Sequence, residues 1–385
     1  MKKILQIPNY QYPHIGGIEQ VARDIADALL DDKEIEQKII CFNEDAQDGN
    51  YVCHRKETVH DKVDGVEVIR CGCIAKVSSQ SISLTYPGEL KRIFKMFRPD
   101  IVILHYPNPF VSSFLLPMLP QNVKFVLYWH LDITKQKVLG KLFHGQTMGL
   151  LKRADQIVAT SPNYIEGSPY LRLFKEKCIA IPNCIRPERL TVTEKAQKRA
   201  MQIREQYKGK TICFAVGRHV PYKGITYLVQ ASKLLDDSFV ILIGGKGPLT
   251  DSLKKEAEGD KNVVFLGRVS DAELISYYLA CDIFAFPSIT KNEAFGIALA
   301  EGMYFGNPAV TFTIPGSGVN YVNLNGVTGI ECPNSDVSAF AEAVKLLQAD
   351  QLLAHQYGTA AKKRVEQNFM YEQFKQQIKE LLTAP

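Results

Sequence analysis

Two glutamates, Glu293 and Glu301, flank a segment whose residue types suit a ligand that carries both hydroxyl and phosphate groups. The segment follows an apolar stretch, Ile283–Phe286, which predicts a strand, and a helix is expected to begin at Glu293. Phe295 and Gly296 would then offer main-chain N–H groups at a helix N-terminus, which favours a bound phosphate. Carboxylates repel phosphate but accept hydrogen bonds from hydroxyls. The pattern therefore indicates a sugar nucleotide, although acidic residues also occur at ordinary helix N-termini.

Two cations, Arg218 and Lys223, follow a second expected strand, Thr211–Val216. Gly217 and Gly224 border them, which places both cations in a strand-to-helix turn. Positive side chains at such a turn can neutralise a diphosphate that leaves during a reaction. We expect both to line an open cleft, so that their loss would leave folding largely intact.

A pair of glycines, Gly16 and Gly17, lies between the first expected strand, Lys3–Pro8, and a helix that begins near Ile18. Glycine allows a backbone to approach a phosphate closely. Such a pair is a weak signal by itself. Its position after a strand matches that of the two cations, and this agreement strengthens both interpretations.

The elements that must position these residues alternate between apolar strands and amphipathic helices. Continuous runs of Val, Ile and Leu predict parallel strands that are covered on both faces. The alternation stops over 187–210, a polar stretch without strand character, and then resumes. We therefore predict two Rossmann-like, doubly wound parallel-sheet α/β domains, over 1–190 and 191–365, that face a cleft. The stretch 366–385 is expected to form a helix that packs back toward the first domain.

Composition excludes several classes of protein. The chain has 385 residues, of which 46% are hydrophobic and 23% charged, as is typical of globular domains. Its net charge of +5 is too small to indicate nucleic-acid binding. Nine scattered cysteines, an odd number, argue against a disulfide framework or a zinc ribbon. Because no apolar run approaches the roughly 20 residues of a transmembrane helix or resembles a signal peptide, we expect a cytoplasmic protein.

Taken together, the motifs resemble those of glycosyltransferase family 4, and the resemblance runs along essentially the whole chain. It implies a retaining enzyme of GT-B architecture that is most similar to the bacterial members that build surface polysaccharides. The motifs are Gly16-Gly17-Ile18-Glu19, Gly217-Arg218, Tyr222-Lys223-Gly224, the Glu-x7-Glu pair, and Ile181-Pro182-Asn183.

The resemblance also implies roles for individual residues. Glu293 would hold hydroxyls of the donor sugar, and Glu301 would hold the ribose. Arg218 and Lys223 would hold the diphosphate. Further contacts to the nucleotide sugar would come from main-chain and loop positions, namely Gly16, Gly17, Gly245, Arg268, Val269, Phe295 and Gly296.

A histidine completes this set. His130 ends the expected strand Lys124–His130, where the family places a histidine near the transferred sugar. A single histidine is more often structural, but Asp132 two residues later favours a functional role. The resemblance therefore implies four catalytic residues, His130, Arg218, Lys223 and Glu293.

The chemistry requires a charge-stabilising site. Breaking the bond between sugar and diphosphate makes an oxocarbenium-like sugar and a diphosphate anion. Enzymes that hold this anion with Mg²⁺ usually present an Asp-x-Asp pair, and the sequence contains none. We therefore predict that the two cations replace the metal and that no cofactor is needed. No carboxylate nucleophile stands out, so we expect retention by same-face attack guided by the leaving phosphate.

Three other functions stay open at this point. Gly245-Lys246-Gly247 follows a strand as in a dinucleotide fingerprint, but Thr250 replaces the third glycine, which disfavours an oxidoreductase. Another two-domain sugar-nucleotide enzyme, such as an epimerase, would need no acceptor for turnover. A non-catalytic sugar-binding module would leave the two cations without a role.

Two basic stretches, 89–98 and 135–153, lie in the domain that is expected to bind the acceptor. The first combines four cations with Leu90, Ile93 and Phe97 at helical spacing, which suits an anionic membrane surface. The same apolar residues would equally suit the core face of an ordinary helix. We therefore expect a saccharide or lipid-linked saccharide acceptor, with peripheral binding at the inner face of the cell membrane as one option.

Overall fold

The chain folds into two compact units. The computed structural model describes residues 1–14, 16–44, 52–77, 80–133 and 137–383, the side chains of 137–142 excepted. Unit 1 contains residues 1–160, 168–181 and 374–385, and unit 2 contains residues 161–167 and 182–373. The long stretch of unit 2 thus begins at Pro182 rather than near residue 190, and the chain returns to unit 1 at Phe374.

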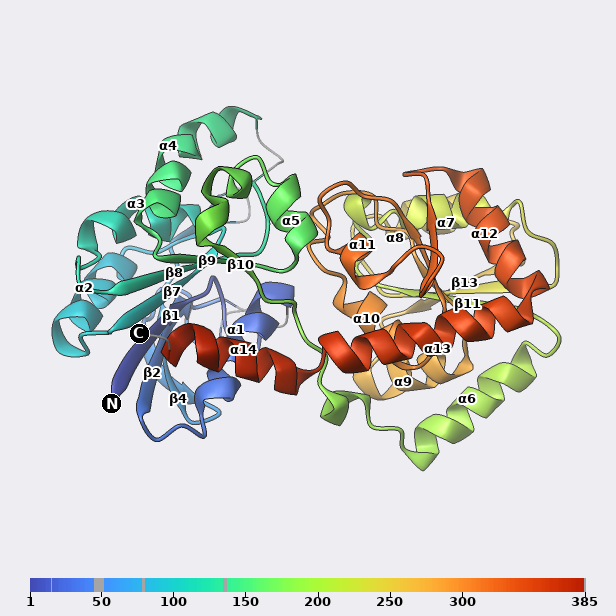
Figure 1. Ribbon diagram of the computed structural model, residues 1–385, viewed down its shortest axis with the longest axis horizontal. Helices are drawn as coiled ribbons and strands as arrows, with labels where there is room; N and C mark the ends of the chain where they lie inside the picture. The colour runs from blue at the N-terminus through green and yellow to red at the C-terminus, as the bar shows by residue number, and fades with distance from the viewer. Residues whose placement is uncertain (15, 45–51, 78–79, 134–136, 384–385) are drawn as a thin grey trace. The chain divides into compact units, whose positions relative to one another are not determined.

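Unit 1 is built on a sheet whose strand order is β10-β9-β8-β7-β1-β2-β4-β3 (Figure 1). Within this sheet, as far as the structure describes it, β3 is the strand that runs antiparallel to its neighbour, and the other pairs are parallel. Every residue of β7 is buried, as expected for an interior strand that has helices on both faces. The strands of this sheet are β1 (Lys2–Ile7), β2 (Ile35–Phe42), β3 (Val59–Val63), β4 (Val66–Cys71), β7 (Ile101–Tyr106), β8 (Lys124–Trp129), β9 (Gln156–Ala159) and β10 (Cys178–Ala180). A short separate pair consists of β5 (Ala75–Val77) and β6 (Gln80–Ile82).

The helices of unit 1 bury one apolar face each. In α1 the buried residues Val21, Ile25 and Leu29 recur at helical spacing. The helix expected over Glu89–Phe97 begins earlier, at Tyr86, because Pro87 in its first turn suits a helix start. The helical elements are α1 (Gly17–Leu29), α2 (Tyr86–Met96), α3 (Pro109–Met118), α4 (Lys137–Arg153), the 3₁₀ segment η1 (Leu171–Lys177) and α14 (Tyr371–Thr383), which belongs to unit 1 from Phe374 onward.

Unit 2 contains a parallel sheet in the order β13-β12-β11-β14-β15-β16. All six residues of β12 are buried, and the core of the unit lies on both sides of the sheet. The periodic pattern in the sequence predicted five of these strands and missed the last. The strands are β11 (Thr211–Val216), β12 (Phe239–Gly244), β13 (Val263–Gly267), β14 (Ile283–Phe286), β15 (Ala309–Phe312) and β16 (Gly329–Cys332).

The helices of unit 2 differ from expectation in three places. A helix, α6, occupies part of the polar stretch 187–210, where no element was expected. The helix expected from Glu293 begins only at Ile297, because Gly296 before it has a positive φ of +94°. The single helix expected over 366–385 corresponds to α14, which begins only at Tyr371 because the residues up to Asn368 belong to α13. The helical elements are α5 (Pro162–Gly167), η2 (Pro187–Leu190), α6 (Glu194–Gln206), η3 (Pro221–Lys223), α7 (Ile225–Ser232), α8 (Thr250–Glu256), α9 (Asp271–Ala280), α10 (Ile297–Tyr304), α11 (Val319–Val322), α12 (Val337–Ala349) and α13 (Gln351–Asn368).

In each sheet, the strand order reverses at one strand, so that the connections on its two sides run in opposite directions. In unit 1, β1 lies between β2 and β7, and in unit 2, β11 lies between β12 and β14. In doubly wound sheets, ligands bind beside the carboxyl ends of strands at such a switch point. Gly16 and Gly17 follow β1, Arg218 and Lys223 follow β11, and Glu293 follows β14. The topology therefore places each predicted group at the edge of its own sheet where a ligand would bind.

Candidate active site

Glu293 lies in the loop between β14 and α10 and is held on two sides. Its residue exposure is only 9%. The Ser288 hydroxyl of the same loop donates a hydrogen bond to Oε2 over 3.1 Å. The Ser317 hydroxyl, from the loop after β15, donates to the main-chain oxygen of Glu293. Two neighbouring strand ends thus fix both the backbone and the carboxylate.

Lys223 forms an ion pair with this carboxylate. Its Nζ contacts Oε2 of Glu293 and lies 5.1 Å from the centre of the Phe286 ring. Burial by itself lowers the pKa of Lys223. The negative charge of Glu293, together with a smaller effect of Tyr222, raises this pKa by more than burial lowers it, so the net pKa lies above its ordinary value. Lys223 is therefore a cation at neutral pH, and its side chain is only 15% exposed.

The two loops that carry this pair contact each other through their backbones. The Ile289 N–H donates a hydrogen bond to the Tyr222 carbonyl over 3.0 Å. Gly224 has a φ of +62°, and a Cβ there would lie 2.0 Å from the carbonyl oxygen of Pro287. Only glycine fits both the conformation and the space. The contact between loops therefore brings together residues that are far apart in the chain.

Arg218 occupies a different environment from Lys223. Its side chain is exposed, and it makes no hydrogen bond or ion pair within the described part of the chain. The turn that carries it is packed tightly, because a Cβ on Gly245 would lie 1.9 Å from the Gly217 carbonyl oxygen. Arg218 thus offers an exposed cation on the turn that follows β11, five residues before Lys223.

The predicted base-binding residues lie at the ends of β12 and β13. Gly245 has a φ of +115°, and its N–H donates to the Gly267 carbonyl over 2.6 Å. Arg268 is exposed and Val269 is partly buried. Gly217, Gly245 and Gly267 therefore follow one another along the carboxyl edge of β11, β12 and β13. Contacts of these residues with a base stay a prediction.

At the start of α10, the groups available to a ligand are main-chain groups rather than side chains. Phe295 is 2% exposed and packs edge-on against Phe369, with 5.3 Å between ring centres. Gly296 caps the helix. Glu301 lies one turn into α10, because the helix begins at Ile297, and its Oε2 accepts a hydrogen bond of 2.9 Å from the Tyr278 hydroxyl. Burial raises the pKa of Glu301 to about 7.

In unit 1, Gly16 and Gly17 lie at the start of α1, and the space around the two residues differs. A Cβ on Gly16 would lie 2.3 Å from Oε2 of Glu19, whereas a Cβ on Gly17 would meet nothing within 4 Å. The Glu19 carboxylate thus folds back over the helix start. Burial raises the pKa of Glu19 to about 7. The open approach to this helix N-terminus is beside Gly17.

His130 follows β8 and is 5% exposed. Asp132, which the sequence suggested as its partner, accepts hydrogen bonds from Trp129 Nε1 over 3.0 Å and from the Ser168 hydroxyl over 2.8 Å. These two hydrogen bonds connect Asp132 to Trp129 and Ser168 rather than to His130, and the functional role of His130 stays a prediction. The partner of His130 is His105, with 2.9 Å between Nε2 and Nδ1. Sequence reasoning missed His105 because it lies on another strand.

Comparisons with known proteins identify the family. Two family models match, "Glycosyltransferase Family 4" over residues 15–189 and "Glycosyl transferases group 1" over residues 196–364. O-antigen chain mannosyltransferase C of Escherichia coli is 30% identical over 95% of this chain and 94% of its own length. The chain belongs to glycosyltransferase family 4. D-rhamnosyltransferase WbpZ of Pseudomonas aeruginosa is 34% identical over 75% of this chain and 76% of its own length.

Solved structures confirm the fold class of this glycosyltransferase. Sucrose-phosphate synthase from Thermosynechococcus elongatus matches with a TM-score of 0.78 at 19% identity, over 100% of this chain and 98% of that one. HepE from Anabaena, in complex with UDP and glucose, matches with a TM-score of 0.78 at 16% identity over the full length of both chains. The prediction of two Rossmann-like parallel-sheet domains of the GT-B type is confirmed. The cleft between them stays a prediction.

The residues that the structure describes in this glycosyltransferase contain neither a candidate metal site nor a candidate membrane-spanning helix. Within these residues, no three His, Cys, Asp or Glu side chains gather in a way that could hold a metal ion. Within the same part of the chain, no helix has both the length and the apolar character needed to span a bilayer. The predictions of metal independence and of binding to a membrane surface stay predictions.

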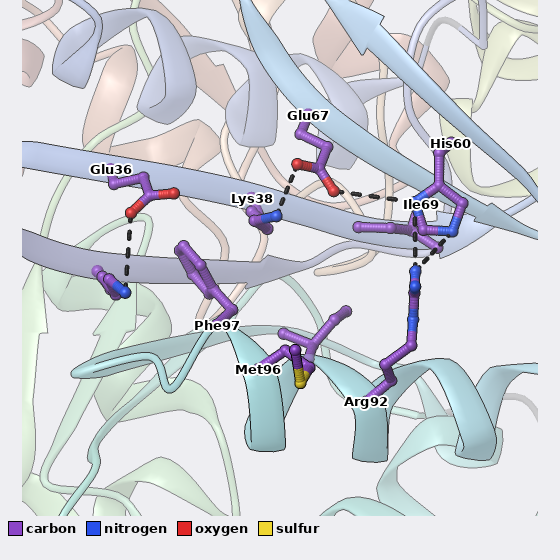
Figure 2. Close-up of a pocket in the computed structure, with 10 residues that line it drawn as sticks. Glu36, Lys38, His60, Glu67, Ile69, Arg92, Met96 and Phe97 are labelled. Atoms are coloured by element: carbon purple, nitrogen blue, oxygen red, sulfur yellow. Dashed lines mark hydrogen bonds and ion pairs between the residues drawn. The ribbon is translucent and has the colours of Figure 1, made fainter.

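A hollow of about 350 Å³ in this glycosyltransferase lies between α2 and the sheet of unit 1 (Figure 2). Nζ of Lys3 and of Lys38 lie 5.5 and 5.1 Å from the centre of the Phe97 ring. Lys38 pairs with Glu67 over 2.6 Å, and Arg92 contacts His60 over 2.8 Å (Figure 2). Lys3 lies near the start of β1, so the hollow is at the amino ends of the strands, away from the candidate site.

Proposed function

We propose that this glycosyltransferase transfers a hexose-type sugar, with retention and without a metal, from a nucleotide-diphosphate sugar to a saccharide or lipid-linked saccharide. The observation that carries the proposal is the Lys223–Glu293 ion pair beside the unpaired Arg218. Relatives named as an O-antigen mannosyltransferase and a D-rhamnosyltransferase support a role in the synthesis of a bacterial surface polysaccharide.

In the proposed mechanism, each charged group has a separate task. Arg218 has no competing partner and is available to the departing diphosphate, whose negative charge grows as the sugar bond breaks. Lys223 adds a second positive charge to the same edge of the sheet. Glu293, whose carboxylate is held by Ser288 and Lys223, accepts hydrogen bonds from sugar hydroxyls. The acceptor attacks from the face that the phosphate leaves, and the phosphate takes up its proton.

The relatives also favour one class of donor. Several are named as mannosyltransferases, and two of these, from Corynebacterium glutamicum and Mycolicibacterium smegmatis, are named as GDP-mannose-dependent. We infer that this enzyme uses a GDP-linked sugar of the mannose type.

Ligand binding and transfer test the proposal directly. A thermal-shift screen of GDP-mannose, UDP-glucose, dTDP- and ADP-sugars, with NADH as the control, is expected to give its largest rise with GDP-mannose. Transfer to a saccharide acceptor is then followed by NMR, which reads the anomeric configuration of the product. Retained configuration and full activity in EDTA are expected. Inverted product, loss of activity in EDTA, or turnover without an acceptor would each contradict part of the proposal.

We also propose that unit 1 contacts an anionic membrane through the exposed cations of α2 rather than by insertion. Leu90, Ile93 and Phe97 are at most 5% exposed, so these apolar side chains belong to the core. Lys91 and Lys95 are exposed. Each cation near an anionic surface contributes roughly 1 kcal/mol. In the second basic stretch, Lys135 and the side chains of Lys137 and Lys141 lie outside the described residues.

Sedimentation with liposomes tests the membrane proposal. Binding to anionic vesicles is expected at low salt and should weaken at moderate salt, because the contact is electrostatic. Reversal of both charges in Lys91→Glu/Lys95→Glu should abolish it. Lys195→Glu/Lys198→Glu on α6 is a matched control, since both lysines are exposed on a helix of unit 2. Equal binding by the two double variants would contradict the proposal.

A further inference from the structure

Three buried side chains in unit 1 form a hydrogen-bonded chain that the proposed mechanism does not use. Gln6 lies on β1, His105 on β7, and His130 directly after β8, and these strands are neighbours in the sheet (Figure 1). Oε1 of Gln6 lies 3.2 Å from Nε2 of His105, and Nδ1 of His105 lies 2.9 Å from Nε2 of His130. Gln6 and His105 are 0% exposed.

The amide oxygen of Gln6 sets the direction of this chain. A carbonyl oxygen can only accept, so the hydrogen of His105 must lie on Nε2. A neutral imidazole carries a single N–H, which leaves Nδ1 of His105 as an acceptor. His130 must then donate from its own Nε2, and its Nδ1 keeps a lone pair.

The surroundings keep both rings neutral and hold the plane of His130. Burial lowers the pKa of His105 to about 3, and burial together with the neighbouring His105 lowers the pKa of His130 well below its ordinary value. The His130 ring stacks on Tyr128 and on His105, with ring centres 5.0 and 5.2 Å apart. Nδ1 of His130 makes no hydrogen bond in the part of the chain that the structure describes.

We propose that Gln6 and His105 are positioning residues that hold His130 as its Nε2–H tautomer, so that Nδ1 accepts a hydrogen bond from a hydroxyl of the donor sugar. This inference rests on the proposed function and on the family resemblance, which implies that His130 lies near the transferred sugar. A buried residue on β1, two strands away, would thereby decide which kind of group His130 recognises. With the opposite tautomer, Nδ1 would be a donor, and the site would favour an acceptor group on the ligand instead.

The tautomer can be measured without any activity. ¹⁵N NMR of the full-length protein, labelled at histidine and assigned with His130→Gln, should show hydrogen on Nε2 of His130 and none on Nδ1. Gln6→Met removes the acceptor and keeps a side chain of similar size. The hydrogen of His130 should then exchange between Nε2 and Nδ1, so that the ¹⁵N shifts of the two nitrogens are averaged. Gln6→Glu keeps an acceptor oxygen and should restore the wild-type pattern. Hydrogen on Nδ1 in the wild-type protein, as a reversed Gln6 amide would produce, would overturn the proposal.

Binding measurements separate positioning from a purely structural role. Gln6→Met should weaken binding of GDP-mannose about fivefold, the loss of roughly one hydrogen bond, and leave binding of GDP unchanged. The same substitution in a His130→Ala background should have no further effect. His60→Gln, in the hollow of Figure 2, is the control and should change neither affinity. Unchanged GDP-mannose binding by Gln6→Met would refute the positioning role. If the wild-type protein binds no nucleotide sugar, the proposed function fails, and the NMR result still decides the tautomer.

Discussion

Arg218 and Lys223 hold different positions in unit 2, although their spacing in the sequence suggested one pair of equivalent cations. Arg218 is exposed and unpaired in the described part of the chain. The Lys223 side chain is 15% exposed and forms an ion pair with Glu293. Arg218 is therefore as exposed as expected, whereas Lys223 is largely buried, and the open cleft itself stays a prediction. The reason is the contact between two loops, which the sequence does not display.

Lys223→Ala and Arg218→Ala should differ in their effect on stability but not in their effect on activity. Lys223→Ala should lower the free energy of unfolding by about 3 kcal/mol, because it leaves the Glu293 carboxylate buried without its cation. Arg218→Ala should change it by less than about 0.5 kcal/mol. Both should lower turnover roughly 100-fold or more, since each removes a charge from the leaving-group site. Urea unfolding and steady-state kinetics measure the two effects, and near-normal turnover of either variant would refute its role.

The pKa of Glu301 predicts a pH dependence of stability. Its pKa of about 7 lies above the ordinary value of 4.5, so the folded protein binds this proton more tightly than the unfolded chain. The resulting stabilisation is complete below pH 4.5 and is lost as the pH rises through 7. Relative to Glu301→Gln, the wild-type protein should therefore lose about 3 kcal/mol of unfolding free energy over this range. Urea unfolding of both proteins at several pH values tests this, and a constant difference would contradict it.

At the scale of elements, the site depends on how the β11–α7 and β14–α10 loops meet. Gly224 allows the close approach, because any side chain there would run into the Pro287 carbonyl. The same residue is the C-cap of η3 and the N-cap of α7, so one position serves two elements and a tertiary contact. Displacing it would move Lys223, the residue directly before it in the chain.

Gly224→Ala should cost more than the same change at a matched position. Gly209 has a similarly positive φ of +78°, and a Cβ there would meet nothing within 4 Å. Gly209→Ala should therefore cost only the backbone strain of roughly 1–2 kcal/mol. Gly224→Ala adds a clash with backbone and should cost about 2 kcal/mol more, with a loss of activity. Equal unfolding free energies for the two variants would show that the loop contact contributes nothing.

Helix α6 shows why a periodic pattern can be missed. Thr193 caps it, with its hydroxyl accepting from the Ala196 N–H over 3.1 Å. Only Ala196, Ala200 and Ile203 are buried, so the apolar stripe is narrow and two of its three members are small. The remaining residues are polar, which made the stretch look like a linker. Burial against α9 supplies the context that the pattern lacked.

At the scale of the whole molecule, the C-terminal helix completes the unit that the chain began with. Phe374, Ile378 and Leu382 of α14 are at most 2% exposed. Lys2 and Lys124 of the sheet donate hydrogen bonds of 3.0 Å to carbonyl oxygens near the end of this helix. Unit 1 is therefore assembled from both ends of the sequence.

Changes in α14 should therefore destabilise unit 1. Ile378→Ala should lower its unfolding free energy by about 3 kcal/mol through the cavity that it leaves. Glu380→Ala, at an exposed position of the same helix, should change it by less than about 0.5 kcal/mol. Hydrogen exchange of β1 and β8 measures the effect, with faster exchange expected only in the first variant. Unchanged protection of these strands would show that α14 is dispensable for unit 1.

The sequence by itself determined most of the strands, the turns that follow them and the family. An unbroken apolar run such as β7 or β12 identifies a buried parallel strand from a few adjacent residues, and glycines next to it mark the turn. These are properties of short segments, so they can be seen without knowing the fold. For the same reason the sequence correctly placed Gly16, Arg218 and Glu293 after strands.

Only the tertiary structure decided which of these residues touch. The pairing of Lys223 with Glu293 requires that β14 lie beside β11, and the contact of His105 with His130 requires that β7 lie beside β8. Strand order is a property of the whole sheet, and no short segment carries it. Asp132 illustrates the converse, because it lies two residues from His130 in the sequence and yet accepts hydrogen bonds from Trp129 and Ser168. The burial that shifts the pKa of Glu301 likewise arises only when α9 and α10 pack together.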